Sequence, residues 1–187
     1  MTTIGILALG NADRTLVEGL IDPLKKTFGI PVEMRYTAVP VESFYDRTRS
    51  QYNSTAILQW LHRRYGGEAF EQSSARSHKT LAVIGYDLFI PILTFVFGEA
   101  ELGGTSAVVS YNRLQNERYG LPPNKHLLLD RLRKEAVHEL GHAFGLVHCH
   151  THECVMHTST YVEDIDLKSD RFCEECVEVL HNVLVAR

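Results

Sequence analysis

Residues 138–148 read HELGHAFGLVH, and this stretch determines both the expected architecture and the expected chemistry. On a helix, His138 and His142 lie about 40° apart around the axis and about 6 Å apart along it. Both imidazoles can therefore reach a single metal ion. Gly145 can end the helix at a positive φ, so that the following turn brings His148 back to the same ion. Three protein ligands with one open position are typical of a catalytic zinc site.

Glu139 follows the first histidine and is placed to act as a general base without being a metal ligand. A single histidine is more often a hydrogen-bonded core residue, so the prediction depends on the whole pattern. Its five fixed positions match by chance on the order of 10⁻⁴ times in a chain of ordinary composition. H-E-x-x-H-x-x-G-x-x-H is the signature of metzincin zinc peptidases. The sequence therefore predicts a catalytic zinc ion on His138, His142 and His148, with Glu139 as the catalytic residue.

All four cysteines lie in the last quarter of the chain. Cys149 and Cys154 form one pair and Cys173 and Cys176 another, which is the spacing of a structural zinc site with four thiolate ligands. Two disulfides and a redox C-x-x-C motif remain alternatives. Disulfides need an oxidising compartment, whereas the opening MTTIGILALG lacks the basic region of a secretory signal. We expect a cytoplasmic protein with two zinc ions per chain, one catalytic and one structural.

Both motifs together resemble one known family, the archaemetzincins, which are metzincin-clan zinc metallopeptidases with an additional four-cysteine zinc site. The resemblance rests on residues 138–176, about a fifth of the chain. It implies that Met156 forms the Met-turn, an apolar floor beneath the zinc histidines. The spacing from Met156 to Cys173 differs by about one residue from the usual family loop, which affects no ligand. The implied activity is hydrolysis of peptide bonds by a zinc-bound water that Glu139 activates.

The remaining pattern predicts an α+β fold whose N-terminal part resembles α/β proteins. Strand-like and helical segments alternate up to residue 144, and an irregular region and a last helix follow. We expect a metzincin-like mixed, mostly parallel sheet with an antiparallel edge strand. Residues 1–145 would form the N-terminal subdomain with the sheet and the active-site helix. Residues 146–187 would form a small C-terminal subdomain with the Met-turn, the four-cysteine site and the last helix, within one compact catalytic domain.

Two further assignments concern the substrate. The edge strand of a metzincin sheet binds an extended peptide by strand addition. The run from residue 105 to 111 is the candidate edge strand, and the side chains assigned to it are Thr105, Ala107, Val109 and Tyr111. The phenol of Tyr161 is a candidate stabiliser of the reaction intermediate, although no spacing requires it.

Composition and charge exclude several classes of partner. The 187 residues carry a net charge of −4 and contain no apolar run near the roughly 20 residues of a membrane span. Acidic residues also surround the cysteines, which disfavours a nucleic-acid-binding zinc module. We therefore expect a peptide or protein substrate, with neither nucleic acid nor membrane as partner. The alternatives are a catalytically silent zinc protein of the same fold and a zinc hydrolase that is not specific for peptides.

Overall fold

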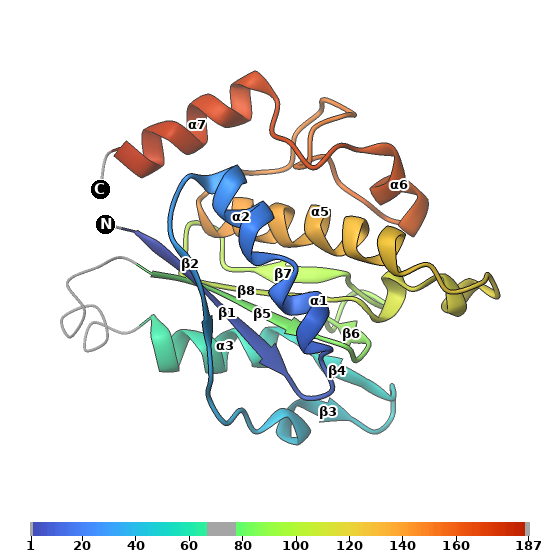
Figure 1. Cartoon of the computed structure of the whole chain (residues 1–187). Coiled ribbons are helices and arrows are strands. Elements are labelled where there is room, and N and C mark those ends of the chain that lie inside the picture. The colour runs from blue at the N-terminus through green and yellow to red at the C-terminus, as the bar shows by residue number, and fades with distance from the viewer. Residues whose placement is uncertain (1, 67–77, 186–187) are drawn as a thin grey trace.

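A twisted five-stranded sheet forms the centre of the computed structural model, which describes residues 2–66 and 78–185 (Figure 1). Its strand order is β2-β1-β5-β8-β7. Neighbouring strands are parallel except for the last pair, in which β7 is antiparallel to β8. This confirms the predicted mostly parallel sheet with an antiparallel edge. The strands are β1 (Thr3–Leu9), β2 (Val32–Arg35), β5 (His78–Ile84), β7 (Gly98–Ala100) and β8 (Ser106–Ser110).

Helices cover both faces of this sheet (Figure 1). Helices α1, α2 and α5 lie on one face, α3 lies on the other, and α6 and α7 lie beyond α5. The central strands are buried on both faces, which explains their nearly continuous apolar sequences. The helices are α1 (Arg14–Glu18), α2 (Ile21–Phe28), α3 (Ser54–Tyr65), α5 (Lys125–Ala143), α6 (Val162–Leu167) and α7 (Glu174–Val185).

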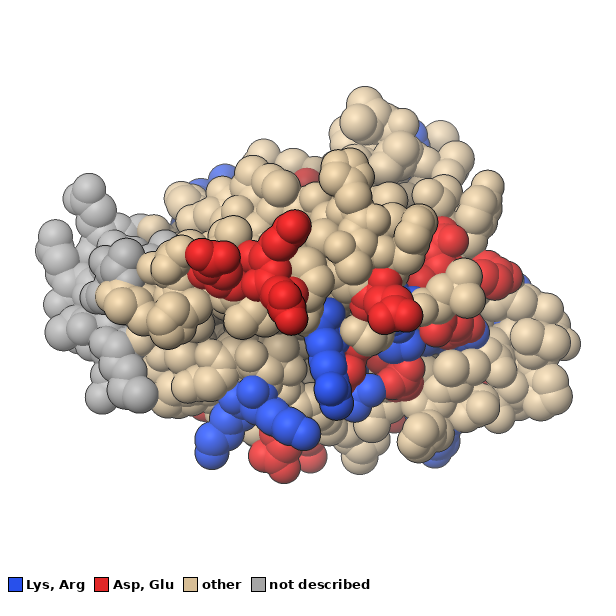
Figure 2. All heavy atoms as spheres, turned by 90° about the horizontal axis from the view of Figure 1, so that it is seen from above, with Lys and Arg blue, Asp and Glu red and all other residues tan. Residues whose placement is uncertain are grey.

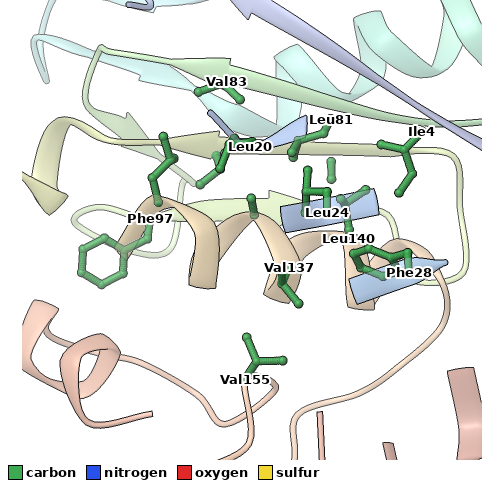
Figure 3. Close-up of a cluster of buried hydrophobic side chains, with 14 of the residues drawn as sticks. Ile4, Leu20, Leu24, Phe28, Leu81, Val83, Phe97, Val137, Leu140 and Val155 are labelled. Atoms are coloured by element: carbon green, nitrogen blue, oxygen red, sulfur yellow. The ribbon is translucent and has the colours of Figure 1, made fainter. Parts of the chain in front are cut away.

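Alternate residues of each strand enter two separate cores. Ile4 and Ile6 of β1 face α2 and α5, whereas Leu7 and Leu9 of the same strand face α3. The larger core also takes in side chains from the C-terminal segment, among them Val155 (Figure 3). Side chains from the sheet, from α5 and from the α2 region meet there: Ile4, Leu20, Leu24, Phe28, Leu81, Val83, Val137 and Leu140.

A second, smaller sheet and three 3₁₀ turns complete the fold. Strand β4 lies between β3 and β6, antiparallel to β3 and parallel to β6. This small sheet lies near the carboxyl ends of the parallel strands (Figure 1). Its strands are β3 (Tyr45–Asp46), β4 (Gln51–Asn53) and β6 (Leu88–Phe89), and the turns are η1 (Val41–Phe44), η2 (Asn112–Leu114) and η3 (Asn116–Tyr119).

The apolar residues between positions 16 and 24 have helical spacing, but the chain forms two helices there, α1 and α2. Gly19 ends α1, and its backbone N–H donates to the carbonyl of Thr15. Strand β2 is also shorter than its alternating sequence suggests and ends at Arg35. Helix α6 lies in the region that was expected to be irregular. Its six residues are too few to show a helical hydrophobic period.

The assignment of the edge strand is wrong. Residues 105–111 contain β8, which is hydrogen-bonded to β5 on one side and to β7 on the other. The edge of the sheet at this end is β7. Ala107, Val109 and Tyr111 are buried in the large core, and Thr105 lies in the turn that leads from β7 into β8. The backbone of β8 is paired on both sides and is therefore not available to an added strand.

Candidate metal centres and active-site cleft

Helix α5 carries the first two histidines and is fixed at both ends. At its start, the Asn124 side chain accepts a hydrogen bond from the backbone N–H of Leu127 at 3.0 Å. At its end, Gly145 adopts φ 97°, and its N–H donates to the His142 carbonyl at 2.8 Å. This left-handed residue reverses the chain, as the sequence predicts. The turn directs His148 back toward the helix.

A buried cation also holds the end of this helix. The Lys79 ammonium of β5 donates to the carbonyl of Ala143 at 2.7 Å and to the carbonyl of Gly104. Gly103 in the same turn donates to the His142 carbonyl at 2.9 Å. Positive charge at a helix C-terminus is favourable because the last carbonyls are unpaired. The turn between β7 and β8 is therefore joined directly to the end of the histidine helix.

The structure brings His138, His142 and His148 together. Their ligand atoms all lie within 4.8 Å of one another. The Nε2 atoms of His138 and His142 are 3.1 Å apart. Two ligands at the usual Zn–N distance in a tetrahedron are about 3.3 Å apart. The spacing of these two nitrogens therefore fits a shared zinc ion.

Backbone carbonyls orient two of the three imidazoles. The Nδ1 atom of His138 lies 2.8 Å from the carbonyl oxygen of Val155, and that of His142 lies 2.7 Å from the carbonyl oxygen of Leu146. An N–H at Nδ1 leaves the Nε2 lone pair free for a metal. Burial lowers the pKa of both rings, most strongly that of His138. Both imidazoles are therefore held in the neutral form that binds metal.

Glu139 is buried between α5 and the edge strand β7. A Cβ atom added at Gly98 would lie only 2.6 Å from the Glu139 side chain, so the carboxyl group lies directly against the strand backbone. Burial raises the pKa of Glu139 well above its usual value, and the charge of Glu135 adds to this effect. Lys168 acts in the opposite direction. A raised pKa suits a carboxyl group that accepts and later returns a proton.

A cleft of about 360 Å³ opens beside these groups. One wall consists of residues 93–98, which lead into β7. Thr158, Ser159 and Thr160 form another part of the wall. Its floor contains His138, Glu139, His148 and Glu135. The candidate base and two candidate ligands therefore face one open space, as a catalytic site requires.

A buried ion pair connects the floor of the cleft to the C-terminal segment. Lys168 Nζ lies 2.9 Å from Glu135 Oε1, and the two side chains are 1% and 4% exposed. The same ammonium lies 3.2 Å from the carbonyl oxygen of His157. His157 precedes the wall at Thr158. Lys168 thus joins the histidine helix to one wall of the cleft.

Met156 is fully buried beneath the histidine helix. A Cβ atom added at Gly141 would overlap its sulfur atom, so the thioether packs against the helix backbone between His138 and His142. The Met156 carbonyl accepts a hydrogen bond from the N–H of Cys149 at 3.0 Å. This residue therefore contacts the segments that carry both candidate metal sites.

The four cysteines form a second cluster, with their sulfur atoms within 4.8 Å of one another. Cys149 and Cys173 are 3.7 Å apart and Cys154 and Cys176 are 3.8 Å apart. These distances exclude disulfide bonds, which are about 2.05 Å long. Four sulfurs around a tetrahedral zinc ion are about 3.8 Å apart at the usual Zn–S distance. The donor set therefore fits a structural zinc ion.

The environment of the four thiols is uneven. The backbone N–H of Cys176 stabilises the Cys173 thiolate and lowers the pKa of Cys173 to about 7. Burial instead raises the pKa of Cys154 and of Cys176.

The face of the molecule that carries α6 and α7 has charges of both signs (Figure 2). Acidic side chains form several groups with basic ones beside them, and the described residues of this face form no continuous basic surface.

Several residues of the site carried no signal in the sequence. Gly98, Glu135 and Lys168 belong to no sequence motif. They lie near the histidines only because distant segments of the chain pack together. Tyr161, in contrast, is 66% exposed at the start of α6 and is not among the residues that line the cleft.

In the part of the chain that the structure describes, no helix is both long and apolar enough to cross a membrane.

Comparison with known proteins places this architecture in a family. A profile of peptidase family M54 matches residues 13–182. An archaemetzincin of Methanocaldococcus jannaschii is 37% identical over 179 residues, which cover 96% of this chain and 93% of the relative. An archaemetzincin of Pyrococcus furiosus is 39% identical over 170 residues, covering 88% and 83% of the two chains.

Solved structures agree with this result. The archaemetzincin of Archaeoglobus fulgidus in complex with malonate superposes with a TM-score of 0.79 at 37% identity, covering 95% of this chain and 99% of the other. A zinc-dependent peptidase of Methanocorpusculum labreanum gives 0.82 at 30% identity with the same coverage. Metalloproteinase-II of Bacteroides fragilis, at 11% identity and 0.59, shares the fold. The chain therefore belongs to peptidase family M54, the zinc metallopeptidase family of the archaemetzincins.

Proposed function

We propose that this protein is a metzincin-type zinc peptidase that hydrolyses peptide bonds. The observation that carries the proposal is the arrangement of His138, His142, His148 and Glu139 around one open cleft. The three histidines would hold the catalytic zinc ion. The four cysteines would hold a second, structural zinc ion, which gives two ions per chain.

The reaction requires a nucleophilic water, a polarised carbonyl group and a proton carrier. A zinc ion in such a site supplies a Lewis acid that lowers the pKa of water and polarises a carbonyl group. Glu139 removes the proton from the attacking water and then passes it to the leaving amine. Its burial against Gly98 holds the carboxyl group at the edge strand, where a substrate backbone would lie. Met156 serves as the Met-turn and supports the helix from below.

The substrate would lie along β7. This strand is the edge of the sheet, and Gly98 brings its backbone next to Glu139. An extended peptide can add to such an edge through main-chain hydrogen bonds. Because β7 replaces residues 105–111 in this role, the substrate contacts come from residues 93–100. The free thiols of the cysteine cluster fit a reducing compartment such as the cytoplasm.

Digestion of a diverse peptide library, read by mass spectrometry, tests this function. The zinc-loaded protein is compared with Glu139→Ala, which should retain its fold and zinc but lose at least about 100-fold in rate. Cuts made only by the protein with Glu139 would support the proposal. A folded, zinc-loaded protein that cuts no peptide would contradict it and favour a catalytically silent protein or another class of substrate.

A further inference from the structure

A second hollow adjoins the active-site cleft. Its volume is about 730 Å³, and Thr94 lines both spaces. Tyr86 and Asn112, each two residues beyond the end of β5 or β8, line it, so it lies at the carboxyl ends of parallel strands. Ligands of open α/β sheets bind in this position. We call it the tyrosine–arginine pocket, after Tyr45, Tyr52, Tyr86, Arg49, Arg113 and Arg118.

The pocket is within reach of a peptide that lies on the edge strand. Gly98, the point of contact with Glu139, is four positions after Thr94. An extended chain advances about 3.3 Å per residue, so this distance is at most about 13 Å. A substrate strand along β7 has the same rise. A side chain or chain end three to four residues from the scissile bond would therefore reach the pocket.

An ion pair supports the wall between the two spaces. Arg113 donates two hydrogen bonds to Asp87, each 2.7 Å long. Its guanidinium group also lies 4.0 Å from the centre of the Phe95 ring, which faces the cleft. The buried Gln51 amide donates to Asp87 at 3.0 Å and to the Thr94 carbonyl at 2.9 Å. The pocket therefore has a wall that several partly buried polar contacts hold in place.

The pocket has more positive than negative charge. Three arginines and two acidic residues line it. The bidentate contact with Arg113 already compensates Asp87, and Arg118 lies 3.4 Å from the same carboxylate. Arg118 is 44% exposed and keeps donors available. Arg49 donates to the uncharged carbonyl groups of Leu93 and Pro91, and Glu42 is the second acidic residue of the lining.

Aromatic rings form the other side of the pocket. Tyr52 and Tyr86 are stacked with centroids 4.4 Å apart, and Tyr45 lies 5.0 Å from Tyr52. The stacked rings give the pocket an apolar surface in addition to its charged one. Arginine binds carboxylates well because its planar donors match the two oxygens.

We propose that the tyrosine–arginine pocket binds a carboxylate of the substrate, three to four residues from the scissile bond. The inference rests on the proposed peptidase function and specifies its substrate class as peptides with an acidic group at that distance. The carboxylate comes either from an acidic side chain or from the end of the peptide chain. Both sources present the same two oxygens to Arg118.

Paired peptides test the proposal. From a peptide that the zinc-loaded protein cleaves, versions are made with Glu or Gln at each position up to five residues from the cut. Each version is prepared with a free or an amidated C-terminus, which separates the two sources of the carboxylate. The kcat/KM ratio of each pair is measured for the wild-type protein, Arg118→Gln and Arg118→Lys. Arg63→Gln, an exposed arginine of α3 outside the pocket, is the matched control.

The wild-type protein should prefer the carboxylate by about tenfold at one position three to four residues from the cut, through KM. Arg118→Gln should bring this ratio close to one, Arg118→Lys should retain part of it, and Arg63→Gln should retain all of it. Equal ratios in the wild-type protein and Arg118→Gln would overturn the inference and leave the peptidase function intact. Binding of the same pairs to zinc-loaded Glu139→Gln gives a readout without cleavage, and equal affinities there would also overturn it.

Discussion

The side chain of Glu139 lies directly against the backbone of Gly98, with no room for even a methyl group between them. Gly98→Ala should therefore displace the carboxyl group from its position at the edge strand. A shift of about 1 Å in a catalytic group can reduce the rate about 100-fold. We expect kcat to fall by this order while the zinc content is unchanged, as measured by steady-state kinetics and metal analysis. Ala100→Ser on the same strand is the control and should retain most activity.

The buried ion pair between Lys168 and Glu135 should be essential for stability when only one partner is removed. Lys168→Met leaves Glu135 as an uncompensated buried charge and should lower the free energy of unfolding by about 3–5 kcal/mol. The double variant with Glu135→Leu should regain most of this loss. Denaturant unfolding measures both values. Arg14→Met, which breaks an exposed pair with Glu18, should change stability by less than about 1 kcal/mol.

Met156 should stabilise the fold through the volume that its side chain fills. Met156→Ala would leave a cavity under the histidine helix and should lower the free energy of unfolding by about 2–5 kcal/mol. Met156→Leu nearly conserves the volume and should lower it by less than about 1.5 kcal/mol. Urea unfolding of the zinc-loaded proteins distinguishes the two. A similar cost for both variants would show that the sulfur atom, and not packing, is what matters.

Asp164 should make stability dependent on pH at the acidic end. Its carboxylate accepts from the N–H groups of Thr160 and Tyr161, both at 2.8 Å, and these contacts lower the pKa of Asp164. The contribution is therefore complete above the unfolded pKa of about 3.9 and is lost as the pH falls through the lower folded pKa. Asp164→Asn should cost about 0.3–1 kcal/mol at pH 7 and less as the pH approaches 3.

Unfolding midpoints of both proteins between pH 7 and pH 3 measure this effect. Glu163→Gln is the matched control because it removes a charge from the same helical turn and leaves the two contacts of Asp164 intact. A stability difference between wild type and Asp164→Asn that does not shrink toward acid pH would show that charge is not the cause.

The two metal centres should be occupied separately. His142→Ala should reduce the zinc content from two ions to one and abolish activity while the fold persists. Cys176→Ser should also remove one ion, but with a loss of thermal stability, because it opens the site that joins α7 to the preceding segment. Metal analysis and calorimetry measure both outcomes. A loss of both ions in either variant would contradict independent sites.

Local patterns were sufficient to predict the sheet and the histidine helix. The apolar run of β5 lies within the strand itself, and Gly145 lies two residues beyond the end of the histidine helix. The edge was assigned to the wrong strand of a β-hairpin, to β8 in place of β7. A hairpin sequence shows that two strands pair, but it does not show which of them has a further neighbour.

The contacts that shape the cleft could not be predicted from the sequence, for a different reason. Gly98 and Glu139 are 41 positions apart, and Lys168 and Glu135 are 33 positions apart. No periodic pattern links such residues, since each pair is created by the packing of α5 against another segment. No spacing supported the prediction for Tyr161, and its side chain is exposed to solvent at the start of α6.

His148 and Cys149 are consecutive, so one peptide unit joins a donor of each metal cluster. Displacement of the thiolates by an oxidant or an alkylating reagent would release the irregular segment that holds the third imidazole in place. A hydrolytic centre without any sulfur ligand would thereby acquire sensitivity to thiol chemistry. The same linkage implies an order in which the two metal sites form. Formation of the sulfur cluster fixes Cys149, and this in turn fixes the position of His148.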